Sequence, residues 1–258
     1  MRNTDGALSE YVMNGKTYTV ITTCDNCGEP VDLELGLYEF RRICSCERQR
    51  NTERKINRLR RNGLTDMALY DMRFENDKGF NPEMADRAKK YVDHWEEMRG
   101  KNIGLMLTGG VGTGKTFFAS CIANALIDNG VFVLMTTLSR LINSGFDEEY
   151  KEAMRSVEQA ELLILDDVGS ERDTGFAWER AFDVVDTRIR TGKPLIVTTN
   201  LSKKTMEESK NSQERRVYDR IIGACVAITV AGDSIRRKQN AEKTDGLRKI
   251  FGWLTQGE

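Results

Sequence analysis

Short, nearly continuous apolar runs alternate with longer amphipathic stretches from Ile103 onward. The strand candidates are 103–108, 131–136, 161–166, 194–199 and 224–230. Apolar runs without polar alternation are typical of strands buried on both faces of a parallel sheet. The connections of up to 27 residues leave room for crossover helices. The pattern therefore predicts a doubly wound α/β sheet flanked by helices.

The chain upstream of this alternation is more varied. Residues 8–23 predict a hairpin, because runs of Val, Tyr, Thr and Ile flank Asn14-Gly15, a pair that tolerates the positive φ of a tight turn. Residues 46–62 are polar and charged, as in an exposed helix or a partly ordered linker, and residues 82–99 predict a helix. We predict a small N-terminal module, a linker with a helix, and the sheet domain, at 1–62, 63–100 and 101–258.

The composition is that of a soluble globular chain, with 39% hydrophobic and 31% charged residues. No stretch approaches the roughly 18–20 consecutive apolar residues of a membrane helix, and the N-terminus has no apolar signal core. We therefore expect a cytoplasmic protein without a membrane partner.

A glycine-rich segment lies between the first candidate strand and a helical stretch. It reads GGVGTGKT and matches the pattern G-x-x-x-x-G-K-[ST]. In this context successive backbone N–H groups wrap phosphates, Lys115 reaches the terminal phosphates and Thr116 can ligate Mg²⁺. The predicted ATP-binding residues are Gly109, Gly110, Val111, Gly112, Thr113, Gly114, Lys115 and Thr116. The alternative is a glycine-rich turn without a ligand, which the strand–loop–helix context disfavours.

Polar side chains end two of the other candidate strands. Asp166 and Asp167 close the run LLILDD. P-loop enzymes hold Mg²⁺ with a carboxylate at this place, so we assign that role to Asp166 and polarisation of the attacking water to Asp167. A Glu is more usual at the second position, so the shorter Asp167 points to slow hydrolysis. Asn200 follows LIVTT, where it could hold that water or sense the γ-phosphate. The alternatives are a strand-end cap and an Asn that starts a turn.

Four of the six cysteines are close together in the N-terminal part. Cys24 and Cys27 form a C-x-x-C pair, and Cys44 and Cys46 form a C-x-C pair 16 residues later. Four thiolates at such spacing could surround one structural, tetrahedral Zn²⁺. The alternative is unpaired or redox-active thiols, and the shorter second pair weakens the zinc signal.

The segment Arg41–Arg61 is strongly basic. It carries a charge of +7, whereas the rest of the chain carries -8 and the whole chain -1. Such a segment could contact DNA phosphates or an acidic patch on a partner. The alternative is a solvated helix, because no aromatic residue is interleaved for stacking on bases.

Taken together, these motifs resemble the DnaC/DnaI and IstB group of AAA+ ATPases over roughly residues 68–240. The likeness includes GGVGTGKT, LLILDDVGSE, DTR followed by GKPLIVTTNL, then RRVYDR and the final Ser234-Ile235-Arg236. The resemblance implies a protein that binds a replicative DnaB-type helicase ring and delivers it to single-stranded DNA. For the IstB branch it implies a transposase helper. It further implies that the cysteine-bearing N-terminal module contacts the helicase.

The resemblance also implies roles for three further residues. Arg220 becomes an arginine finger that reaches the γ-phosphate of a neighbouring subunit, which implies catalysis in a homo-oligomer, hexameric or helical. Arg236 becomes the second sensor of its own subunit, and only 22 residues follow it, too few for a C-terminal helical lid. Phe74 lies where such loaders shape the adenine pocket. The alternatives are surface or salt-bridged arginines and a core aromatic.

We therefore expect an ATP-dependent helicase loader that uses ATP, Mg²⁺ and Zn²⁺ during the initiation of DNA replication. One alternative is an IstB-like transposase-helper ATPase, which the zinc module mildly disfavours. A second alternative is an adaptor that binds nucleotide without hydrolysing it.

Overall fold

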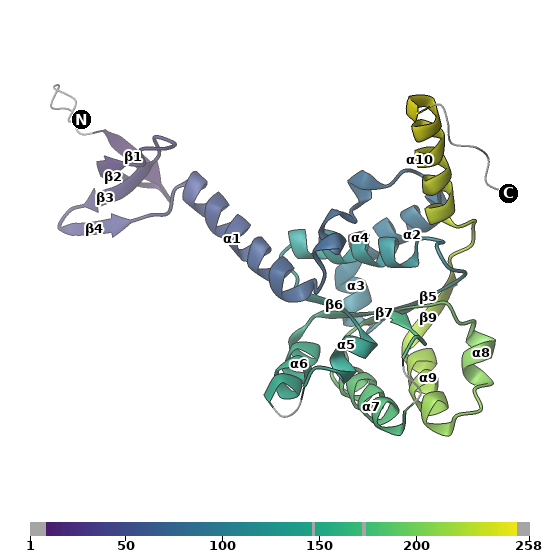
Figure 1. Cartoon of the computed structure of the whole chain (residues 1–258). Helices are drawn as coiled ribbons and strands as arrows, with labels where there is room; N and C mark the ends of the chain where they lie inside the picture. The colour runs from purple at the N-terminus through teal and green to yellow at the C-terminus, as the bar shows by residue number, and fades with distance from the viewer. Residues whose placement is uncertain (1–8, 146–147, 172–173, 252–258) are drawn as a thin grey trace. The chain divides into compact units, whose positions relative to one another are not determined.

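The computed structural model describes residues 9–145, 148–171 and 174–251 (Figure 1). The chain divides into two units between Arg58 and Leu59. This division falls inside helix α1 (Ser45–Gly63), which ends at Gly63. The predicted exposed helix is therefore present.

The N-terminal unit contains an antiparallel sheet in the order β1-β2-β3-β4. Its strands are β1 Glu10–Met13, β2 Lys16–Thr23, β3 Pro30–Leu35 and β4 Tyr38–Arg41. Asn14 and Gly15 have φ angles of 51° and 73°, as a tight hairpin turn requires. The predicted hairpin is confirmed, although its first residue, 8, lies outside the described part. The described core is a small cluster centred on Tyr18, Val20 and Leu33.

The second unit contains the predicted parallel sheet, in the order β6-β7-β8-β5-β9. Its strands are β5 Gly104–Thr108, β6 Val133–Thr137, β7 Leu162–Val168, β8 Leu195–Thr199 and β9 Cys225–Thr229. One expectation is wrong: β9 is not buried on both faces. It is an edge strand, and its Val226 is 58% exposed.

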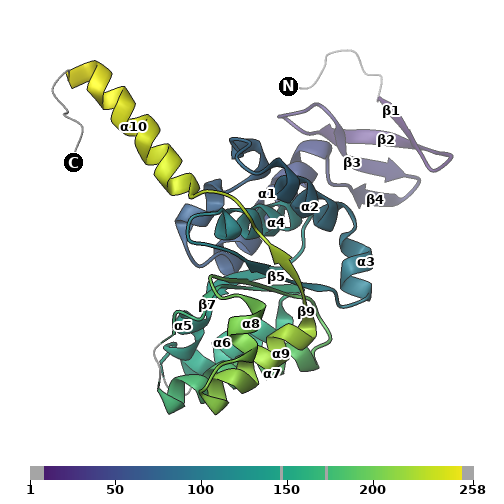
Figure 2. The ribbon, with the colours of Figure 1, turned by 90° about the vertical axis from the view of Figure 1, so that its right-hand side faces the viewer.

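Helices cover both faces of this sheet. Helices α2 and α4 lie on one face and α6, α7 and α9 on the other (Figures 1 and 2). The helical bounds are η1 Met67–Asp71, η2 Phe74–Asn76, α2 Pro82–Asp93, α3 Trp95–Gly100, α4 Lys115–Asp128, α5 Leu138–Ile142, α6 Glu148–Gln159, α7 Gly175–Arg190, α8 Lys203–Glu207, α9 Ser212–Ala224 and α10 Ile235–Phe251. None of the helices in the described ranges is long and apolar enough to span a bilayer.

The helix expected at 82–99 is two helices rather than one. His94, with φ -104° and ψ 24°, ends α2 and precedes α3. This break brings the buried Trp95 against Tyr91, with the ring centroids 6.2 Å apart. Burial of Trp95 thus outweighs the continuous helical periodicity.

Arg188 on α7 is completely buried and ties two connections together. Its guanidinium donates to the carbonyl oxygens of Val157, Ala160, Glu161 and Pro194. These bonds join the end of α6 to the start of β8. Burial lowers the pKa of Arg188 to about 10, and the carbonyl oxygens replace the water that the cation loses.

Candidate functional site

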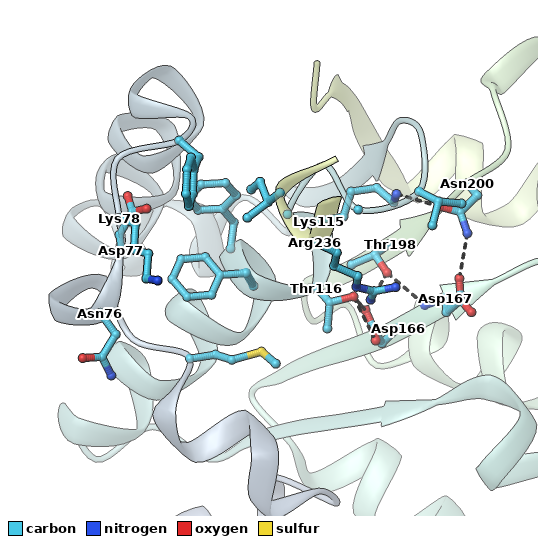
Figure 3. Close-up of a pocket in the computed structure, with 18 residues that line it drawn as sticks. Asn76, Asp77, Lys78, Lys115, Thr116, Asp166, Asp167, Thr198, Asn200 and Arg236 are labelled. Carbon is cyan, nitrogen blue, oxygen red and sulfur yellow. Dashed lines mark hydrogen bonds between the residues drawn. The ribbon is translucent and has the colours of Figure 1, made fainter. Parts of the chain in front are cut away.

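A cavity of about 520 Å³ lies at the carboxyl end of the parallel sheet, where ligands of open α/β sheets bind (Figure 3). Its lining comes from four parts of the second unit: the glycine-rich loop with the start of α4, the ends of β7 and β8, the start of α10, and the segment Met72–Phe80. The predicted residues among the lining are Val111, Gly112, Gly114, Lys115, Thr116, Asp166, Asp167, Asn200 and Arg236.

The glycine-rich loop has a backbone that other residues rarely adopt. Gly112 and Gly114 have φ angles of 85° and 99°, and Gly114 caps the N-terminus of α4. A Cβ atom at Gly109 would lie 2.4 Å from the carbonyl oxygen of Val230. The loop therefore packs closely on the residue that directly follows β9. Its N–H groups and the positive end of the α4 dipole form a site suited to an anion.

Lys115 is buried beneath this loop. Its Nζ atom donates to the carbonyl oxygens of Gly109 at 2.9 Å and Gly110 at 2.8 Å, and to Asn200 Oδ1 at 2.7 Å. Burial lowers the pKa of Lys115, while the carboxylates of Asp167 and Asp166 oppose that shift. These three contacts hold the ammonium group at the wall of the cavity.

The carboxylate of Asp166 faces two hydroxyl groups. Thr116 Oγ1 donates to its Oδ1 atom at 2.9 Å, and Thr198 Oγ1 donates to the same atom at 2.6 Å. Carboxylate and hydroxyl oxygens are hard ligands of the kind that Mg²⁺ uses beside phosphates. The donor set of Thr116 and Asp166 therefore fits the expected Mg²⁺.

Asn200 links the two charged sides of the cavity. Its Nδ2 atom donates to Asp167 Oδ1 at 3.1 Å, while its Oδ1 atom accepts from Lys115. Asp167 has φ 57°, a left-handed backbone that is uncommon outside glycine. Such strain is often found at functional sites. The chain thus holds a carboxylate, an amide and an ammonium group in contact where the γ-phosphate is expected.

Arg236 reaches the cavity because the start of α10 packs on the glycine-rich loop. The N–H of Ile235 donates to the carbonyl oxygen of Gly112 at 2.9 Å. Arg236 lines the cavity. Burial is the largest cause of the lowered pKa of Lys115, and the positive charge of Arg236 lowers it further, whereas the carboxylates of Asp167 and Asp166 raise it. An arginine from the far end of the unit is therefore near the loop that is expected to bind phosphate.

Arg220 lies elsewhere, on α9, and is not among the described residues that line this cavity. Its Nη1 atom is 2.8 Å from Asp186 Oδ1, and its guanidinium stacks on the ring of Phe182 at 4.7 Å. Asp186 is buried, whereas the Arg220 side chain is 39% exposed. Arg220 is therefore held at the surface, where it can face another molecule.

Comparison with protein families shows to which family the chain belongs. The family model described as IstB-like ATP binding protein matches residues 43–243, which is most of the chain. The chain belongs to this family. The resemblance to the DnaC/DnaI and IstB group is therefore confirmed, together with the P-loop fold of AAA+ type.

Several relatives of this IstB-like chain are replication proteins. The replicative helicase loader DnaC of Escherichia coli K12 is 28% identical over 161 residues, which are 59% of this chain and 62% of that protein. The replicative helicase loader DnaI of Bacillus subtilis is 23% identical over 260 residues, which cover 89% of this chain and 81% of that one. A putative ATP-binding protein in an insertion sequence of Mycobacterium tuberculosis is 26% identical, over 54% of this chain and 58% of its own length.

Two solved structures share the fold over about two thirds of this chain. A crystal structure of DnaI superposes with a TM-score of 0.55 at 20% identity, over 66% of this chain and 94% of that one. The structure of the DnaC helicase loader gives a TM-score of 0.51 at 18% identity, over 64% of this chain and all of the other.

The aromatic side of the cavity differs from the expectation. Phe74 is not among its described lining residues, and its ring instead lies 5.7 Å from Lys89 Nζ. Phe80 and Met72 line the cavity in its place, together with Phe117. The sequence holds several aromatics near this point and does not indicate which one faces inward.

Thr198 is a second residue that sequence reasoning missed. It lines the cavity and contacts Asp166. Side chains two positions apart in an extended chain share a face, and both Thr198 and Asn200, which directly follows β8, line the cavity. That periodicity was the available signal.

The four N-terminal cysteines converge within the first unit. The Sγ atoms of Cys24, Cys27, Cys44 and Cys46 all lie within 4.8 Å of one another. Zn–S bonds of about 2.3 Å in a tetrahedron place sulfurs about 3.8 Å apart, so this cluster fits Zn²⁺. Gly28, with φ 73°, closes the turn after the first pair by donating its N–H to the carbonyl oxygen of Cys24.

Proposed function

We propose that the chain is an ATP-dependent loader of a replicative DnaB-type helicase, which it delivers to single-stranded DNA. The observation that carries the proposal is the extent of the similarity to the loader of Bacillus subtilis. That similarity covers 89% of the chain. The second unit, residues 59–258, is a smaller share of the chain than this. It therefore includes part of the cysteine-bearing unit as well as the nucleotide fold.

The geometry of the cavity supports ATP binding with hydrolysis. The loop N–H groups and Lys115 would hold the phosphates, and Thr116 with Asp166 would hold Mg²⁺, which neutralises phosphate charge when bound. Asp167 would accept a hydrogen bond from the attacking water, and Asn200 keeps its carboxylate in place. Chemistry of this kind depends mainly on positioning and electrostatics.

Two arginines would make hydrolysis depend on assembly. Arg236 would contact the phosphates of its own subunit. Arg220, held by Asp186 outside that cavity, would serve the site of a neighbouring copy as an arginine finger. A finger supplied by another subunit restricts turnover to the oligomer, hexameric or helical. ATP turnover would then depend on the presence of a neighbouring subunit.

The N-terminal unit would supply the contact with the helicase. Its hydrophobic core is small, so four thiolates around Zn²⁺ would contribute much of its stability. The exposed basic residues of α1 would favour an acidic partner surface or DNA phosphates.

A transposase helper is the second candidate, because the family description and the insertion-sequence relative favour it. That relative matches only 54% of the chain. A third candidate, the adaptor that does not hydrolyse ATP, makes a distinct prediction: bound ATP gives no phosphate in a single turnover, even with partner and DNA.

The deciding experiment is a pull-down from extract of the source cell in the presence of ATP, followed by ATPase assays with the protein recovered. Recovery of the replicative helicase, and turnover that responds to helicase and single-stranded DNA, support the loader. Recovery of a transposase, or ATP turnover that does not change when the helicase is added, contradicts the loader proposal. The variant Lys115→Ala serves as the control that binds no ATP.

A further inference from the structure

The hydroxyl group of Thr198 joins the two acidic residues at the end of β7. Thr198 is 1% exposed. Its Oγ1 atom donates to Asp166 Oδ1 at 2.6 Å and accepts from the backbone N–H of Asp167 at 2.9 Å (Figure 3). A hydroxyl has one donor and two acceptor positions, so this one group satisfies both neighbours.

The contact with Asp167 supports an unusual backbone. Pairing between β7 and β8 is irregular between Leu165 and Val168, which leaves the N–H of Asp167 outside the regular ladder. The same residue has φ 57°. The Thr198 hydroxyl accepts the N–H that the ladder does not use, and the turned backbone directs the Asp167 carboxylate to Asn200. The direction of this carboxylate therefore depends on β8.

The contact with Asp166 restricts the position of that carboxylate. Asp166 Oδ1 is held between the hydroxyls of Thr116 and Thr198, which belong to α4 and β8. Two donors from separate elements restrict the rotation of the carboxylate. The β-branched threonine has few χ1 rotamers, which keeps its own hydroxyl in place.

We propose that Thr198 is a positioning residue that aligns both carboxylates for Mg²⁺ binding and hydrolysis. The inference rests on the proposed ATPase function and acts through Asp166 and Asp167. Thr198 orients the first toward the metal site and the second toward the attacking water. Residues that orient metal ligands commonly change metal affinity or activity by about 10–100-fold when they are replaced.

Thr199, the next residue, provides a matched control. It is also fully buried, and its hydroxyl donates to the carbonyl oxygen of Val168 at 2.6 Å and accepts from the N–H of Leu201 at 3.1 Å. It thus makes the same number of hydrogen bonds in the described structure, but its hydroxyl bonds to neither carboxylate. Replacing it tests the loss of a buried hydroxyl in the same strand.

The test compares Thr198→Val, Thr198→Ser and Thr199→Val in the full chain. ATP affinity is titrated against Mg²⁺ by calorimetry, and turnover and thermal unfolding are measured in parallel. For Thr198→Val we expect about 10-fold or more weaker half-saturation by Mg²⁺ and roughly 10–100-fold slower turnover. We expect unchanged ATP affinity in EDTA. Thr198→Ser should recover most of both losses, whereas Thr199→Val should unfold at a lower temperature but keep wild-type Mg²⁺ dependence and turnover.

Two results overturn the inference: a wild-type Mg²⁺ titration for Thr198→Val, or the same Mg²⁺ defect in Thr199→Val. If the wild-type chain binds ATP without hydrolysing it, the ATPase proposal is wrong. The role of Thr198 in Mg²⁺ binding is then still decided by the Mg²⁺ titration. A wild-type chain that binds no ATP contradicts both.

Discussion

Gly112 is the position where the phosphate loop contacts the start of α10, and replacing it with alanine tests that contact. A Cβ atom built there would lie 2.3 Å from Ser234 Oγ and 3.0 Å from Ser234 Cβ. Ordinary contact needs about 3.5 Å, so the Ser234 hydroxyl must rotate away and the two segments must separate by roughly 0.5 Å. Arg236 is two residues beyond Ser234. Gly112→Ala should therefore displace Arg236 as well as the loop.

The size of the effect follows from two costs. An alanine held at φ 85° loses about 1–2 kcal/mol to left-handed backbone strain. Opening a packed contact costs about 1–3 kcal/mol more. If about 2 kcal/mol of this cost destabilises the ATP-bound conformation relative to the free chain, the Kd for ATP rises about 30-fold.

The assay is ATP binding by calorimetry, with thermal unfolding to follow the fold. Gly192→Ala is the matched control, because Gly192 has φ 62° but nothing within 4 Å of its Cβ position. It measures strain alone and should leave ATP affinity unchanged. Adding Ser234→Gly to Gly112→Ala removes the clashing hydroxymethyl group and should restore a large part of the affinity. Unchanged ATP affinity in Gly112→Ala, or no gain in the double variant, would refute the reasoning.

Three further predictions concern assembly, pH and metal. Arg220→Ala and Lys115→Ala should each lack ATP turnover, yet mixtures of the two should regain part of it. In a mixture, Arg220→Ala supplies the intact cavity and Lys115→Ala supplies the arginine. A mixture as inactive as its components argues against a finger in trans. Burial raises the pKa of Glu171, so the folded chain binds its proton more tightly than the unfolded chain does. Its stabilising contribution is present below the unfolded pKa of about 4.3 and is lost as the pH rises through the folded pKa. Glu171→Gln should accordingly raise the Tm at neutral pH and lose that advantage in acid, and an equal Tm gain at both pH values would contradict this sign. Cys24→Ser should lower the zinc content measured by atomic absorption and unfold the N-terminal unit in circular dichroism, while ATP affinity persists; full zinc content in that variant would count against the cluster as a metal site.

The sequence alone determined the features that depend on local spacing. The glycine-rich loop needs only a strand, glycines at fixed positions and a following helix, so its conformation is encoded within a few residues. Parallel strands end at one edge of the sheet, and for that reason the strand pattern was enough to place Asp166 and Asn200 together. The hairpin at Asn14-Gly15 and the convergence of the paired cysteines follow from similarly local rules.

Only the tertiary structure decided which side chains face one another across distant segments. Phe80 rather than Phe74 lines the cavity, and Val226 on the edge strand β9 is exposed although the other edge strand, β6, is largely buried. The Arg220 contact with Asp186 and the Thr198 bridge likewise depend on how separate helices and strands pack. Local patterns set backbone conformation and amphipathic faces, whereas the partners on those faces are selected by close packing of the whole unit, which no short stretch of sequence contains.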